Sequence, residues 1–149
     1  MSELTVVATM LMLFADFPPI SESIHMTGNL LFYLASFFTV AWGVVHLFPT
    51  KNVVKGFGDI SLDNRRVITM EWINEGATLI FIGVLTAAVT LVDPTSPVAR
   101  AVYWLAIIML NALSIISLFT GFKVNFLPYR LCPIIFTGSS LLILIGMTA

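Results

Sequence analysis

Three stretches of this 149-residue chain contain no Asp, Glu, Lys or Arg over lengths that suit a membrane-spanning helix. They are Met26–Thr50, Ala101–Phe122 and Leu131–Ala149, of 25, 22 and 19 residues. A helix needs roughly 20 mostly apolar residues to cross about 30 Å of hydrocarbon. A fourth stretch, Gly76–Val92, reaches that length if it extends backwards through Glu71 and Glu75. The chain is therefore predicted to span a membrane four times.

The composition excludes several other classes of protein. Hydrophobic residues make up 58% of the chain and charged residues 10%, and the mean hydropathy is +1.00. A soluble domain carries roughly 25% charged residues. Seven Lys and Arg against eight Asp and Glu leave no basic excess for binding nucleic acid. The single cysteine, Cys132, excludes an internal disulfide and a multi-cysteine metal site. We expect a multi-pass protein of the plasma or inner membrane, or of an organelle membrane.

Helix-breaking and helix-capping residues divide the chain at the ends of these stretches. Pro49 and Asp93-Pro94 end helices, whereas Ser96-Pro97 and Pro128 begin them. The links after the second and third helices are short, which favours an all-α, up-down four-helix bundle. The predicted transmembrane domain is 28–149, with helices over about 29–48, 64–92, 98–120 and 128–147. Residues 1–27 are predicted to form an interfacial or half-inserted segment containing a short helix, with a short fifth span as the alternative.

The Lys and Arg residues predict how the bundle is oriented. The link over 50–66 contains Lys51, Lys55, Arg65 and Arg66, and the link over 121–130 contains Lys123 and Arg130. At the other membrane border there is only Arg100. Because short loops rich in Lys and Arg stay in the cytoplasm, both basic links are expected there.

Glu71 and Glu75 are the ionisable residues that cost most to place in a membrane. A charged side chain at a bilayer centre costs about 3 kcal/mol even on mild scales. The two residues are four apart and share one face of a helix. They are the candidate catalytic residues, together with His46 as a partner. The alternative reading is structural: Glu71 pairs with Arg66 or Arg130, and Glu75 bonds to Asn111 or a serine.

Each predicted helix carries one line of polar residues, and polar groups in lipid need partners inside the protein. We therefore expect these lines to converge on a polar pocket open to the cytoplasm. Its predicted lining is Trp42, His46, Glu71, Asn74, Glu75, Asn111, Tyr129 and Thr137. His46, Glu71 and Glu75 could in principle hold a metal ion, but their spacing matches no metal signature. We expect no metal and no cofactor.

Short motifs resemble those of the DoxX-like family of small four-helix membrane proteins. They are His46-Leu47-Phe48-Pro49, a loop with glycines, Asp63-Asn64-Arg65-Arg66 and then Glu75-Gly76. The resemblance covers residues 28–147. Members of the wider family are linked to membrane redox complexes, one of them quinone-reducing. The resemblance assigns no catalytic residue to this chain.

Three functions fit these observations. The first is a non-catalytic accessory subunit that binds a lipid, a quinone or another lipophilic small molecule, alone, as a homo-oligomer or with other membrane subunits. The second is a membrane-embedded acid–base enzyme acting on a lipophilic substrate, such as an isomerase, with Glu75 as acid or base. Membrane isomerases of the sterol type have pockets of similar composition. The third is a proton-coupled carrier.

Overall fold

The computed structural model describes residues 20–125 and 127–149, with side chains from residue 26 onwards. These residues form five α-helices and one 3₁₀-helix, with no strand among them. The elements are α2 (Ile20–Leu47), α3 (Thr50–Gly56), α4 (Leu62–Val92), α5 (Pro97–Phe119), η1 (Gly121–Lys123) and α6 (Leu127–Gly146). The prediction of an all-α bundle is confirmed. The interfacial helix expected before residue 28 falls mainly within residues 1–19, outside the described residues, and stays a prediction.

The helix ends reflect local sequence chemistry. The Ser61 hydroxyl accepts a bond from the Asn64 backbone N–H at 3.2 Å, and Ser96 does the same for Ala99 at 3.1 Å. Both serines thus satisfy an N–H group that has no partner within its helix. α4, α5 and α6 begin and end within two residues of the predicted ranges. α2 instead begins at Ile20, earlier than expected.

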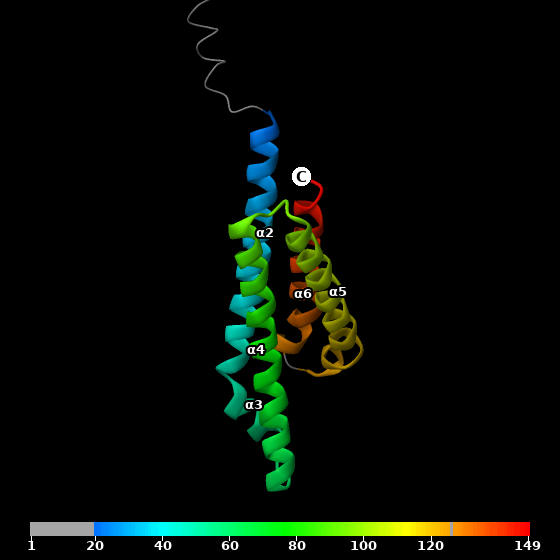
Figure 1. Ribbon diagram of the computed structural model, residues 1–149. Helices are drawn as coiled ribbons and strands as arrows, with labels where there is room; N and C mark the ends of the chain where they lie inside the picture. Colours follow the sequence, from blue (N-terminus) through cyan, green and yellow to red (C-terminus); the bar gives the residue numbers. More distant parts are fainter. Residues whose placement is uncertain (1–19, 126) are drawn as a thin grey trace, which may run out of the picture.

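The expected link over 50–66 contains α3, a helix too short to leave a periodic signal in the sequence. It follows Pro49 and buries Val54, while Lys51 and Lys55 stay exposed. α3 packs against α4 near the point where α4 begins (Figure 1).

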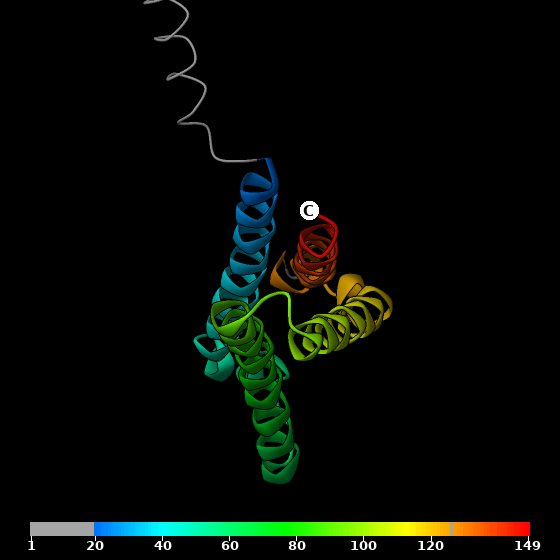
Figure 2. The ribbon, with the colours of Figure 1, turned by 45° about the horizontal axis from the view of Figure 1, so that its top comes forward.

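The four long helices run up and down, and in cross-section they occupy four corners in the order α2, α4, α5, α6 (Figures 1 and 2). α2 packs extensively on α4 and on α6, and α5 packs on α6. The contact between α4 and α5 is the slightest of the four. One seam of the bundle is therefore much less tightly closed than the others.

Each long helix is long and apolar enough to cross a membrane. Their outward faces expose large apolar side chains such as Phe37, Phe81, Leu105 and Ile108. Buried side chains fill the centre of the bundle, among them Phe32, Leu79, Tyr103, Leu110 and Phe136. An apolar exterior around a packed interior is the pattern expected of helices that face lipid.

Glycines bring α2 and α4 into close contact. A Cβ atom on Gly43 would lie 2.7 Å from the Gly76 carbonyl oxygen and 2.9 Å from the Ile80 backbone nitrogen. A Cβ atom on Gly83 would lie 2.8 Å from the Ser36 carbonyl oxygen. Small residues at helix interfaces allow such close approach in membranes.

We call the end of the bundle that carries six of the seven Lys and Arg residues the basic end. These residues are Lys51, Lys55, Arg65, Arg66, Lys123 and Arg130. The basic end comprises α3, the start of α4, η1 and the start of α6 (Figure 1). The remaining cation, Arg100, lies at the opposite end in the first turn of α5.

Gly43→Ala is expected to destabilise the fold by about 1–3 kcal/mol, because the new methyl group meets backbone atoms that cannot move aside. The measurement is reversible unfolding in mixed micelles. Gly138→Ala is the matched control, because no atom lies within 4 Å of its added Cβ. Equal stability of the two variants would contradict the close packing of α2 on α4.

A second prediction concerns Asp93, which follows α4 outside the spanning segments. Its carboxylate accepts bonds from the Thr95 hydroxyl at 2.7 Å and the Thr95 backbone N–H at 2.9 Å. These bonds hold the pKa of Asp93 below its ordinary value. The stabilisation is therefore present above the unfolded-state pKa and is lost as pH falls through the lowered one. Thr95→Val should move the pKa of Asp93 upwards in an NMR titration, and an unchanged value would refute the hydroxyl's role.

Candidate functional site

The two carboxylates of α4 differ in their surroundings. α4 has 31 residues, about 46 Å at 1.5 Å per residue, so it is longer than a bilayer core is thick. Glu71 is exposed, and in the described part of the chain it forms no ion pair. Its expected partners are engaged elsewhere: Arg66 lies 3.7 Å from Asp63, and Arg130 bonds to Asn125 at 3.2 Å.

Glu75 lies one turn deeper and faces His46 of α2. The distance from His46 Nε2 to Glu75 Oε1 is 3.6 Å, and the two side chains are 4% and 33% exposed. The other ring nitrogen, Nδ1, lies 3.3 Å from the Trp42 carbonyl oxygen. A carbonyl oxygen only accepts, so Nδ1 is the donor in that contact. Nε2 and the carboxyl group therefore face each other across this 3.6 Å gap, and either can carry one further proton.

Aromatic rings hold His46 in this position. The Trp72 ring stacks on the imidazole with centroids 4.9 Å apart and planes 23° apart. The Trp42 ring meets it edge-on at 5.8 Å, and Tyr129 of α6 meets Trp72 edge-on at 5.5 Å. Trp72 Nε1 also donates a hydrogen bond to the His46 carbonyl oxygen. The four rings thus join α2, α4 and α6 next to Glu75.

A groove of about 530 Å³ opens beside this cluster, along the loose seam between α4 and α5. One wall is the polar face of α4, with Glu71, Asn74, Glu75 and Thr78. The facing wall on α5 is mostly apolar, with Met109, Leu113 and Ile116. His46 and Tyr129 also line the groove. Its volume lies within the range of about 300–1,000 Å³ for small-molecule sites.

The structure therefore brings five of the eight residues predicted for the pocket to one groove, namely His46, Glu71, Asn74, Glu75 and Tyr129. The other three lie outside its lining. The Asn111 amide joins α5 to α6 by donating to the Ser140 hydroxyl at 2.6 Å, and Thr137 bonds to Ser114 at 2.8 Å. Trp42 meets the His46 ring edge-on, and its buried indole N–H has no hydrogen-bond partner within the described residues.

Sequence reasoning missed the apolar wall and the role of Trp72. Met109, Leu113 and Ile116 follow helical spacing on a helix that is apolar outside its one polar line, so no pattern separates a groove wall from a lipid face. Trp72 lies between the two glutamates in the sequence, but its contact with His46 depends on how α2 and α4 pair. The described part of the chain contains no cluster of three His, Cys, Asp or Glu side chains that could hold a metal ion, and His46, Glu71 and Glu75 do not form one.

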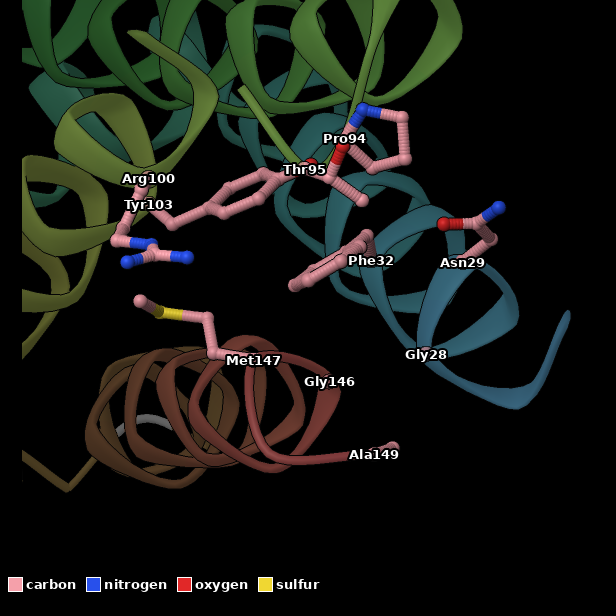
Figure 3. Close-up of a pocket in the computed structure, with 10 residues that line it drawn as sticks. All are labelled: Gly28, Asn29, Phe32, Pro94, Thr95, Arg100, Tyr103, Gly146, Met147 and Ala149. Carbon is pink, nitrogen blue, oxygen red and sulfur yellow. The ribbon is translucent and has the colours of Figure 1, made fainter. Parts of the chain in front are cut away.

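A second, smaller cavity of about 220 Å³ lies at the opposite end of the bundle. Figure 3 shows Arg100 of α5 facing Met147, with the rings of Tyr103 and Phe32 beside them. The Phe32 and Tyr103 rings stack with centroids 4.1 Å apart, and the Tyr103 hydroxyl lies 2.9 Å from the Thr90 hydroxyl. These contacts close the bundle at that end, so the groove beside Glu75 is the stronger candidate site.

The fold and its apolar exterior define a small multi-pass membrane protein. Comparisons with protein-family models, curated proteins and solved structures found no match. The resemblance to the DoxX-like family therefore rests on its short motifs alone.

Trp72→Phe is expected to lower the free energy of unfolding by about 0.5–1.5 kcal/mol, because the ring stack is kept while the hydrogen bond to His46 is lost. Unfolding in mixed micelles measures the change. Trp104→Phe is the control, since Trp104 is 48% exposed on the outside of α5. Equal effects from both substitutions would show that the Trp72 bond does not stabilise the contact between α2 and α4.

Proposed function

We propose that this protein is a small membrane subunit that binds a neutral lipophilic molecule, with a planar hydrogen-bonding head of the quinone type, in the groove between α4 and α5. The observation that carries the proposal is the His46–Glu75 pair, at 3.6 Å, at the bottom of a groove in a lipid-facing seam. The resemblance to a family linked with quinone-reducing complexes points the same way.

The charges of the groove favour a neutral head. Glu71 and Glu75 lie in the lining, and no Lys or Arg does so among the described residues. A phospholipid phosphate would meet like charge without a compensating cation, which is unfavourable at low dielectric. A quinone carbonyl instead needs a single donor, which a proton on either His46 Nε2 or Glu75 would supply.

The two walls suit the two parts of such a molecule. The stacked rings of His46 and Trp72, with Tyr129 across from them, offer aromatic surface to a planar head. Met109, Leu113 and Ile116 offer apolar surface to a tail. A distance of 3.6 Å is too long for a direct hydrogen bond. An oxygen atom of the ligand is therefore proposed to complete the contact between His46 and Glu75.

The same pair supports a second candidate, an acid–base enzyme. In an isomerisation, Glu75 as carboxylate would take a proton from one carbon of a lipophilic substrate. His46, protonated, would return a proton at another carbon, so the overall proton count is unchanged. A proton-coupled carrier has less support, because buried Leu79, Leu110 and Phe136 fill the bundle at the inner end of the groove.

Glu75→Gln is expected to weaken binding of a short-tailed benzoquinone about tenfold or more, because a hydrogen bond to a charged group contributes about 1.5–3 kcal/mol. Quenching of tryptophan fluorescence in nanodiscs follows the binding, since Trp72 lines the groove. Asp63→Asn is the matched control, a carboxylate on the same helix that pairs with Arg66. Equal affinity of wild type and Glu75→Gln would refute the binding site.

Lipophilic molecules extracted with the purified protein distinguish the two candidates. If the protein binds without reaction, Glu75→Gln should retain less of the molecule that accompanies the wild type. If it is an isomerase, the variant should retain an isomer that the wild type converts. Accumulation of such an isomer would replace the binding proposal with the enzyme.

A further inference from the structure

A further pocket, separate from the groove and from the cavity beside Tyr103, lies at the basic end between α3 and the start of α4. Its volume is about 610 Å³, and its charged lining consists of Lys51, Lys55 and Arg65 together with Asp59. Lys51 and Lys55 are one turn apart, so they extend from the same side of α3. Arg65 faces them from α4, which runs beside α3 (Figure 1).

The three cations have no ion-pair partner within the described ranges 20–125 and 127–149. Arg66, the next residue along α4, differs in lying 3.7 Å from Asp63. Three positive groups against the one carboxylate of Asp59 leave the lining with a net charge of +2. Such a pocket attracts an anion that carries several acceptor oxygens.

The position of the pocket favours an anion that belongs to the membrane. α3 follows directly on the end of the spanning helix α2 and turns Val54 inwards, where it is 6% exposed. Val54 also lines the pocket, so apolar surface lies beside the cations. A phospholipid presents a phosphate joined to apolar chains at this level, and basic pockets at the ends of spanning helices bind such headgroups.

We propose that this pocket binds the phosphate of an anionic phospholipid in the leaflet at the basic end, with Lys51, Lys55 and Arg65 as its ligands. The site is independent of the groove. Arg65 and Thr69 lie on one face of α4, and Glu71 and Glu75 lie on another, because each residue advances about 100° around the helix. The charges of the two sites differ accordingly, since the groove is lined by carboxylates and this pocket by cations.

The test compares phosphatidylglycerol with phosphatidylcholine by native mass spectrometry of the full-length protein released from micelles. Wild type should retain phosphatidylglycerol preferentially. Each lost cation should weaken the preference about fivefold, because a basic residue near an anionic surface contributes about that factor. Lys51→Gln with Lys55→Gln should therefore lower it roughly 25-fold, and Arg65→Gln should lower it further.

Lys123→Gln with Arg130→Gln is the matched control, because it removes two positive charges from the other link of the basic end. This control should keep the preference. Equal losses in both double variants would show diffuse attraction to charge and overturn the site. Displacement of phosphatidylglycerol by an equal concentration of inorganic phosphate would overturn the assignment to a lipid. Circular dichroism confirms that each variant remains folded.

Discussion

A carboxyl group within a bilayer needs a partner, and Glu75 finds one in His46 on the neighbouring helix. This contact constrains the structure around it. His46 is held by a Trp42 carbonyl and by the Trp72 ring, and Trp72 bonds back to the His46 backbone. The polar pair is thus supported by aromatic groups from both helices. One face of the pair remains open, at the seam where α4 meets α5.

The open seam follows from how the other seams are closed. α2 and α4 approach each other so closely at Gly43, Gly76 and Gly83 that an added Cβ atom would not fit at any of them. Hydrogen bonds join α5 to α6, from Asn111 to Ser140 and between Ser114 and Thr137. The contact between α4 and α5 is slight. A lipophilic molecule diffusing in the membrane would therefore reach the His46–Glu75 pair from the lipid side, which suits the proposed ligand.

Much of the fold could be predicted from the sequence because membrane spans leave a strong composition signal. The end of α4 and the start of α5 could be predicted from Asp93-Pro94 and Ser96-Pro97, because these residues end and begin helices through local interactions. The grouping of His46 with Glu71 and Glu75 could also be proposed from the sequence, because each is a polar residue in a largely apolar helix. The sequence could not show that Asn111 lies outside the groove. Its amide points to α6, and that direction depends on how α5 is rotated within the bundle. The short helix α3 and the wall of α5 likewise depend on tertiary packing.

The most direct test is an experimental structure of the protein in lipid nanodiscs supplemented with a benzoquinone. Ligand density is expected between α4 and α5, with a planar head against the rings of His46 and Trp72 and an oxygen atom near Glu75. A tail should follow Met109 and Leu113 towards the lipid. The proposed binding site would be contradicted if α5 side chains packed directly on Glu75 and no ligand density appeared at saturating benzoquinone.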